Sequence, residues 1–248
     1  MEEPMRGGFV AGAVRSGSTV RKRPPRDPRF VHGLLEFFER SGWRGAPRFL
    51  GGDESGRDVL EFLEGTVPWG EVPAFVRGES SLAAVGRLMR EFHDLTAGTA
   101  LAGDQEVVCH HDLSPKNTVY RGAVPVAFID WDDAAPGRRV QDVAHACWQF
   151  VGLGPATSDP ARAGRLIGVI ADGYDLAAAD RAELVATILW WQEATWRGIL
   201  AAAGAGDPAM TRLRDDGIAE QVRAAHEWTS QHRAALEPGW PKGVSGSV

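Results

Sequence analysis

Four polar residues near the middle of the chain have the order and spacing that phosphoryl transfer requires. His110, Asp112 and Asn117 form the pattern H-x-D-x-x-x-x-N, and Asp130 follows 18 residues after Asp112. In enzymes that transfer phosphoryl groups, such a loop supplies an aspartate that accepts the acceptor's proton and an asparagine that binds the metal ion. A second aspartate at the end of a strand completes the metal site. The segment therefore predicts phosphoryl-transfer chemistry.

The flanking residues predict a fold that brings these groups together. Val107–Cys109 is a short apolar run typical of a buried strand. Asn117–Tyr120 and Val124–Ile129 are two further apolar runs, and the glycine-containing turn between them indicates a hairpin. We expect this hairpin to return Asp130 toward the loop that carries Asp112, with strands at both ends of the loop as a rigid support.

Five segments carry a resemblance to a known family. They are Leu82–Leu95, His110–Leu113 (HHDL), Ile129–Trp131 (IDW), Ala135–Gly137 (APG) and Asp142–Ala144 (DVA). The sequence HHDL resembles the H-[GN]-D-L of the aminoglycoside phosphotransferase and choline kinase-like family, bacterial phosphotransferases with a protein-kinase-like fold. IDW resembles its I-D-[FW], and the first segment resembles the helix before its catalytic loop. The resemblance extends over most of the chain but is specific only between residues 82 and 144.

The resemblance implies an α+β, two-lobed fold and a division of the chain. Residues 1–64 are expected to form an abbreviated, β-rich lobe that covers the nucleotide. Residues 65–248 are expected to form a larger, mostly helical lobe with the catalytic loop and the substrate site. The implied reaction moves the γ-phosphate of ATP, with Mg²⁺, to a hydroxyl of a small molecule such as an aminoglycoside or another hydroxylated metabolite.

Within the larger lobe the resemblance assigns five roles. Asp112 is the expected catalytic base, while Asn117 and Asp130 are the expected Mg²⁺ ligands. His110 is expected to brace the loop by hydrogen bonding, and Asp142 to accept hydrogen bonds from the backbone of the same loop.

On the nucleotide side the candidates are less regular. Lys22 lies two residues beyond a strand valine and so shares its inward face, as expected for the lysine that pairs with the phosphates. Gly7 and Gly8 are the candidates for a glycine-rich phosphate loop, and Leu63 lies at the expected hinge. Glu36 is the candidate partner of Lys22 on the following helix.

Alternatives remain open on this side of the site. Arg23 is the alternative phosphate ligand to Lys22. Glu39 has a similar spacing to Glu36, whereas alignment with the family favours Val31 or His32 at that helix position.

The acceptor side has two candidates, Asp133 and Glu193, because acidic groups suit a cationic acceptor. Asp132 is a further candidate for magnesium or substrate, with simple surface exposure as the alternative. Residues 1–30 carry a net charge of +4, which leaves −10 for the rest of a chain whose total is −6. This asymmetry fits a cationic nucleotide side and an acidic substrate side, or two ordinary surfaces. Three tryptophans at 190, 191 and 196 are expected to pack between helices.

Composition excludes several other classes of protein. With 44% apolar and 24% charged residues the chain has the composition of a globular protein. No apolar run approaches the ~20 residues of a membrane span, and the N-terminus lacks the apolar core of a signal peptide. Cys109 and Cys147 lie in apolar contexts and are expected to be reduced, as in the cytoplasm. The short basic run without aromatic residues argues against nucleic-acid binding.

Two other functions compete with a kinase. A nucleotide-binding pseudokinase would explain the short glycine segment, and the absence of any magnesium-dependent ATP turnover would identify it. A metal-dependent phosphohydrolase would use His110, His111, Asp112 and Asp130, but such a site places its His-Asp pair on a helix. Pro115 and the flanking strands argue against that helix.

Overall fold

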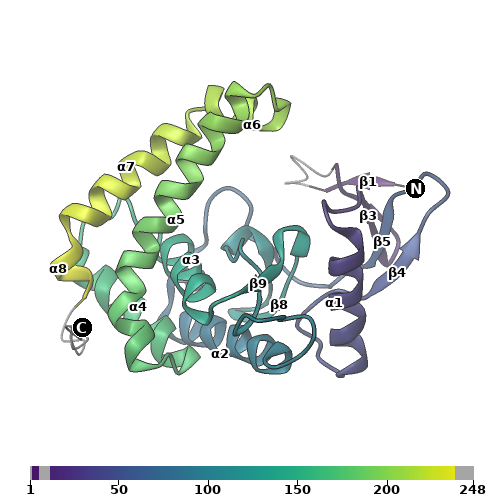
Figure 1. Ribbon diagram of the computed structural model, residues 1–248, viewed down its shortest axis with the longest axis horizontal. Coiled ribbons are helices and arrows are strands. Elements are labelled where there is room, and N and C mark those ends of the chain that lie inside the picture. Colours follow the sequence, from purple (N-terminus) through teal and green to yellow (C-terminus); the bar gives the residue numbers. More distant parts are fainter. Residues whose placement is uncertain (1, 6–11, 238–248) are drawn as a thin grey trace.

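The computed structural model describes residues 2–5 and 12–237, which form two parts arranged along the longest axis of the molecule (Figure 1). The N-terminal part is a small antiparallel sheet with one helix, and the remainder is mostly helical. This arrangement confirms the predicted α+β fold class with a small β-rich lobe and a larger helical one.

The N-terminal sheet positions Lys22 on its inner face. Its strands run in the order β1-β2-β3-β5-β4, and Lys22 at the end of β3 lies opposite Asp58 of β5. Gly17 turns the β2–β3 hairpin at φ +61°, a conformation that glycine adopts readily. The strands are β1 (Glu3–Pro4), β2 (Val14–Ser16), β3 (Thr19–Lys22), β4 (Phe49–Gly52) and β5 (Asp58–Glu61).

Helix α1 (Pro28–Arg40) packs beside this sheet. The Asp27 side chain accepts a hydrogen bond from the backbone N–H of Phe30 at 3.1 Å, and a proline occupies the first helical position, so both helix-start signals are present. Its apolar face is buried through Val31, Leu34, Leu35 and Phe38.

Short strands and 3₁₀ turns carry the segment with the H-x-D-x-x-x-x-N motif. β6 pairs with β9, and β7 pairs with β8, all antiparallel. Ile129 lies just beyond β8 and donates its backbone N–H to the carbonyl of Asn117 at 2.9 Å, which brings the end of the hairpin back to the loop as predicted. The elements are β6 (Val107–Cys109), η2 (Pro115–Asn117), β7 (Thr118–Arg121), β8 (Val124–Phe128), η3 (Trp131–Asp133) and β9 (Ala135–Gly137).

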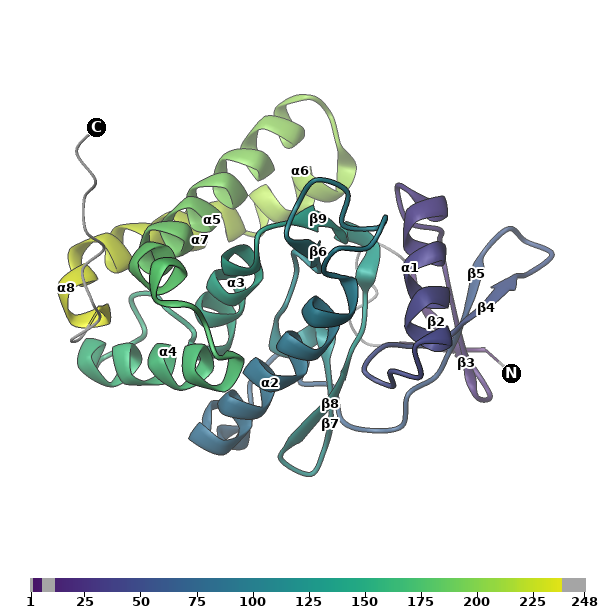
Figure 2. The same ribbon diagram turned by 60° about the horizontal axis from the view of Figure 1, so that its bottom comes forward.

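The helical part packs around α2. Helices α2 and α4 approach closely because Gly173 has no side chain: a Cβ there would collide with the carbonyl of Ala83. The helices are η1 (Ala74–Arg77), α2 (Glu79–Thr96), α3 (Arg139–Val151), α4 (Pro160–Tyr174), α5 (Ala178–Gly204), α6 (Pro208–Asp215), α7 (Ile218–Gln231) and α8 (Arg233–Leu236). Figures 1 and 2 show α5 and α7 side by side as an arm that carries α6 away from the core.

Backbone hydrogen bonds join the two parts. Thr66, in the connection after β5, exchanges two backbone hydrogen bonds of 2.8 Å with Tyr120 of β7, and Phe128 donates to the carbonyl of Gly45 at 2.8 Å. None of the helices in residues 2–5 and 12–237 combines the length and apolar character needed to cross a membrane.

Candidate active site

The catalytic loop orients the carboxylate of Asp112. Asn117 donates its side-chain amide to Asp112 Oδ2 at 2.7 Å and to the Asp112 carbonyl at 2.9 Å. Lys116 donates to the same Oδ2 at 3.0 Å. The five-residue spacing that the motif predicted is produced by the 3₁₀ turn η2, which brings Asn117 back beside Asp112. Aspartate and asparagine of the loop are therefore in direct contact.

His110 ties this loop to the end of the hairpin. Its Nε2 donates to the carbonyl of Ile129 at 3.1 Å, so its Nδ1 is left to accept the backbone N–H of Asp112 at 3.3 Å. The ring is completely buried and lies 4.5 Å from the Trp131 ring between centroids. The position matches the bracing role expected for His110.

Asp142 holds the start of the loop from helix α3. Its two carboxylate oxygens accept the backbone N–H groups of His110 at 2.7 Å and His111 at 2.9 Å. His93 adds a hydrogen bond from Nε2 at 3.2 Å. Burial by itself raises the pKa of Asp142, but the hydrogen bond and charge interaction with His93 outweigh it and hold that pKa well below its usual range. A buried anion therefore fixes the loop backbone.

Two residues of the site adopt left-handed backbone conformations. His111 and Asp130 both have φ +65° without being glycine. His111 stands at the [GN] position of the H-[GN]-D-L motif. Glycine and asparagine both tolerate this left-handed conformation, which accounts for their presence in that motif. The His111 ring donates from Nδ1 to the carbonyl of Asp133 at 3.2 Å, and it lies 5.6 Å from the ring of Trp191.

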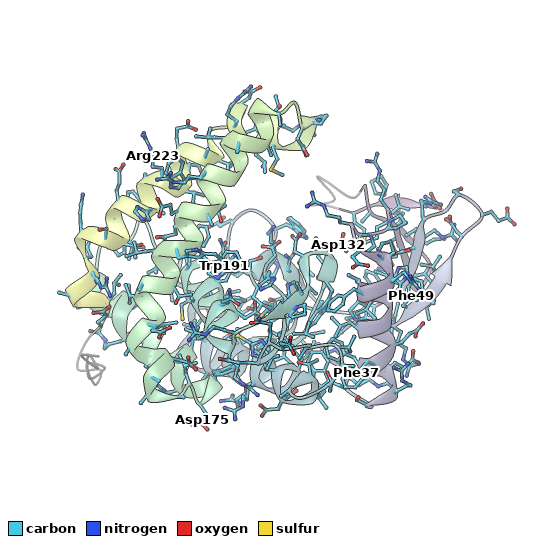
Figure 3. All side chains as sticks on the ribbon, viewed as in Figure 1. Phe37, Phe49, Asp132, Asp175, Trp191 and Arg223 are labelled. Carbon is cyan, nitrogen blue, oxygen red and sulfur yellow. The ribbon has the colours of Figure 1, made fainter. Side chains whose placement is uncertain are left out.

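Lys22 reaches across from the N-terminal sheet to the end of the hairpin. Its ammonium lies 2.6 Å from Asp130 Oδ1 and 2.6 Å from Asp132 Oδ1, and its side chain is only 7% exposed. Burial lowers the pKa of Lys22, but the two carboxylates outweigh it and raise that pKa above its ordinary value. Figure 3 shows Asp132 between the sheet-bearing part and the helical part. Lys22 thus takes the inward position expected of it.

The pKa values of Asp130 and Asp132 shift in opposite directions. Burial raises the pKa of Asp130, yet the Lys22 cation outweighs burial and leaves it below its ordinary value. For Asp132 burial prevails: it raises the pKa despite Lys22, and the nearby charge of Asp130 adds to the increase. The pair is therefore held together by a single buried cation.

The expected ion pair between Lys22 and Glu36 is absent from the described residues, so this prediction needs correction. Glu36 lies on the exposed face of α1 and pairs with Arg40 at 3.6 Å, because the opposite face of that helix is buried. His32 instead points to the sheet, where Nε2 lies 2.8 Å from Asp58 Oδ2. Gly7 and Gly8 lie outside the described residues.

Among the described residues, the side chains of the remaining candidates form no hydrogen bond or ion pair with the loop of residues 110–117. Asp133 is exposed, and Glu193 pairs with Arg197 on the same helix at 2.6 Å. Leu63 is partly buried in the connection after β5. Trp191 donates to the carbonyl of Gln141 at 2.8 Å, which agrees with the helix packing expected of it.

Sequence reasoning missed two contacts of the site. Lys116 was given no role, although its place four residues after Asp112 within the motif was a usable signal. Asp132 was expected at magnesium, at substrate or at the surface, and its contact with Lys22 has no sequence signal because the two residues are 110 positions apart.

The described residues also contain a buried group of possible metal ligands, formed by His93, Cys109 and Asp142. Each is already engaged: Cys109 donates to the carbonyl of Arg138 at 3.3 Å, and His93 and Asp142 bond to each other. The group therefore acts as a support of the loop.

Residues 78–180 match the phosphotransferase enzyme family. The chain is 31% identical, over an alignment 267 positions long, to the trifolitoxin immunity protein of Rhizobium leguminosarum bv. trifolii. The alignment covers 93% of this chain and 95% of the relative.

Solved structures share the fold at low sequence identity. A choline/ethanolamine kinase family protein from Mesorhizobium loti superposes with a TM-score of 0.63 at 16% identity, over 96% of this chain and 93% of that one. An ethanolamine kinase from Plasmodium vivax gives 0.63 at 12% identity over 95% and 83%. An aminoglycoside phosphotransferase from Streptomyces rimosus, in complex with ADP and streptomycin, gives 0.53 at 16% identity over 71% and 86%. These structures confirm the fold. The family match over residues 78–180 and the 31% identical relative confirm the resemblance seen in the sequence: the chain belongs to the phosphotransferase enzyme family.

Proposed function

We propose that this protein is an ATP- and Mg²⁺-dependent phosphotransferase that moves the γ-phosphoryl group to a hydroxyl of a small molecule. The observation that carries the proposal is the convergence of Lys22, Asp112, Asn117 and Asp130. Asn117 contacts Asp112 at 2.7 Å, and Lys22 contacts Asp130 at 2.6 Å from 108 positions away in sequence. A purely structural role for these four residues does not explain why the family motif and a buried lysine meet at one place.

Asp112 is the group that handles the proton. Asn117 and Lys116 both bind Oδ2, whereas Oδ1 accepts no hydrogen bond from the part of the chain that the structure describes. Oδ1 is therefore the oxygen that accepts the proton of the acceptor hydroxyl and holds that hydroxyl in line with the phosphoryl group. Positioning and charge neutralisation supply most of the rate in such transfers.

The donor set fits Mg²⁺. Asn117 uses its amide nitrogen on Asp112, so its oxygen is left for a metal, and Asp130 adds a carboxylate. Magnesium prefers hard oxygen ligands of this kind and keeps several waters. When bound, it would supply positive charge that neutralises the phosphates. We assign Asn117 and Asp130 as the residues that would hold it, while Asp132 contacts Lys22 at 2.6 Å.

Lys22 is the proposed phosphate ligand on the nucleotide side. The Lys22 ammonium is paired with the carboxylates of Asp130 and Asp132 and not with a glutamate of α1. These two aspartates therefore take the place of the helix carboxylate that the family resemblance implies. Nucleotide phosphates would share this cation with the two aspartates. We propose the connection near Leu63, at the end of the N-terminal lobe of residues 1–64, as the region that contacts the base.

The test is an ATP-consumption screen with purified protein against aminoglycosides, macrolides, choline-like alcohols and sugar derivatives. Wild-type protein should turn over ATP with Mg²⁺ in the presence of an acceptor. Asp112→Asn should lower kcat by about 10²-fold or more while changing the dissociation constant of ATP by less than about threefold. Wild-type turnover by Asp112→Asn would refute the assignment of the base. Binding of ATP without turnover on any acceptor would favour the pseudokinase.

A second candidate concerns the biological role. Similarity to an immunity protein over 95% of that relative suggests that the acceptor is a toxic compound, inactivated by phosphorylation. Expression of wild-type protein in sensitive bacteria should raise the inhibitory concentration of such a compound, and expression of Asp112→Asn at the same level should not. Equal protection by both would indicate protection by binding rather than by transfer.

A further inference from the structure

Lys116 is placed beside the reacting groups, and the family motif assigns it no part. Its ammonium lies 3.0 Å from Asp112 Oδ2. The Lys116 side chain is 47% exposed, and the Asp112 side chain is 26% exposed. Both members of the pair are therefore partly open to solvent and to a bound substrate.

The hydrogen-bonding capacity of this pair is only partly used. An ammonium has three N–H donors. Within the described residues, Lys116 contacts one acceptor, Asp112 Oδ2. Two donors consequently have no acceptor among the described residues. Oδ2 itself already receives Lys116 and Asn117, so the two lone pairs of that oxygen are occupied.

We propose that Lys116 is a catalytic residue that contacts the γ-phosphoryl group with these two donors while it holds Oδ2 of Asp112. The inference rests on the proposed function and deepens it. Lys116 then orients the base and neutralises charge on the transferring group from a single position. An ordinary surface ion pair between residues i and i+4 would contribute little to stability and would leave turnover unchanged.

In the proposed chemical step, the bond that forms, the bond that breaks and the proton transfer each involve identified groups. The acceptor oxygen forms a bond to the γ-phosphorus as the bond from that phosphorus to the β,γ-bridging oxygen breaks, and ADP leaves with the bonding electrons. The acceptor proton passes to Asp112 Oδ1. Charge is spread over the three equatorial oxygens during transfer, and a cation supplied there from the same chain accelerates the reaction. Lys116 supplies this cation beside Asp112, whereas Lys22 contacts Asp130 and Asp132.

The experiment compares Lys116→Met, Lys116→Arg and a control, Arg165→Met. Methionine keeps the chain length and removes the charge, while arginine keeps the charge with a different geometry. Arg165 is exposed on α4, a helix that packs on α2, α3 and α8. We expect Lys116→Met to lower kcat by about 10²-fold and to raise the KM for ATP by up to about tenfold, because the lost contact also holds bound ATP. Lys116→Arg should recover part of that loss, and Arg165→Met should stay within about twofold of wild type.

A binding measurement separates this proposal from the proposed function. Calorimetry with ADP and with the non-hydrolysable β,γ-imido analogue of ATP measures the contact to the γ-phosphoryl group directly. Lys116→Met should weaken binding of the triphosphate analogue by about tenfold and leave ADP binding unchanged.

The outcomes are distinct. If wild-type protein binds nucleotide but transfers phosphate to no acceptor, the proposed function fails. The comparison of ADP binding with analogue binding then still shows whether Lys116 contacts the γ-phosphoryl group. Equal loss of affinity for both nucleotides, or a kcat for Lys116→Met within about threefold of wild type, would overturn the role of Lys116. Failure to bind either nucleotide would overturn both.

Discussion

The structure makes a sharp prediction at Asp142, whose carboxylate is fully buried beneath the catalytic loop. Its substitution by asparagine preserves the shape of the side chain but exchanges one acceptor oxygen for an N–H₂ group. Both carboxylate oxygens currently accept backbone N–H groups, from His110 at 2.7 Å and from His111 at 2.9 Å. In Asp142→Asn one of these N–H groups therefore faces another donor, and His93 loses a charged acceptor.

The magnitude follows from these contacts. A hydrogen bond to a charged group contributes about 1.5–3 kcal/mol, and leaving a buried donor unpaired costs about 1–3 kcal/mol. We therefore expect Asp142→Asn to lower the free energy of unfolding by about 3–5 kcal/mol, a large part of the ~5–15 kcal/mol that stabilises a typical protein. Because His110 and His111 precede Asp112, turnover should fall as well, even under conditions where the variant is folded.

Urea denaturation followed by circular dichroism measures the change, and Asp94→Asn is the control. Asp94 also takes part in ion pairs, with Arg90 at 2.7 Å and Arg139 at 2.8 Å, but its side chain is 48% exposed. Exposed ion pairs contribute about 1 kcal/mol or less, so the control should lose no more than that. A loss below about 1 kcal/mol in Asp142→Asn, or equal losses in the two variants, would refute the buried-anion argument.

Two further predictions concern stability. Burial lowers the pKa of His93 and of His145, so at pH values just below their unfolded pKa of about 6.5 the unfolded chain binds more protons than the folded one. The free energy of unfolding should therefore fall between pH 7 and pH 5, by up to about 1.4 kcal/mol per pH unit for each histidine, and His145→Gln should flatten that slope in urea titrations. Gly173→Ala should lower the free energy of unfolding by about 1–3 kcal/mol because its Cβ would meet the carbonyl of Ala83, whereas Gly168→Ala on the same helix, with open space around it, should raise stability by up to about 1 kcal/mol in the same measurement.

The centre of the site was predictable because its information is local. Residues 107–130 contain a strand, a turn and a hairpin, each of which has its own sequence signal, and the structure forms all three. Once β7 and β8 pair, Asp130 must return to the loop that contains Asp112 and Asn117. The roles of these residues remain predictions, but the proximity on which the roles depend follows from short-range rules.

The nucleotide side was less predictable because its contacts are between distant segments. Residue spacing did not settle which carboxylate helix α1 offers, and Glu36 lies on the face opposite the buried one. The partners of Lys22 lie 108 and 110 positions away, so no spacing rule relates them to it. The boundary after residue 64 likewise stays a prediction.

Two strained backbone conformations in the site depend on long-range contacts that sequence rules alone do not predict. Among the described residues, three non-glycine residues have positive φ: His111, Asp130 and Asp175. Asp175 is explained by its place at the end of α4, where a left-handed residue commonly terminates a helix. The other two lie in the site, where each left-handed residue costs on the order of 1 kcal/mol.

That cost is offset by long-range contacts. Asp142 accepts the backbone N–H of His111, and Lys22 binds the carboxylate of Asp130. Neither conformation is favoured by the residue that adopts it, so each depends on a partner from another element. Loss of either partner would release one end of the segment 111–130 from its conformation, and the alignment of Asp112 with the proposed metal ligands would be lost with it. The buried anion on α3 and the buried cation on β3 therefore position the catalytic segment from opposite ends.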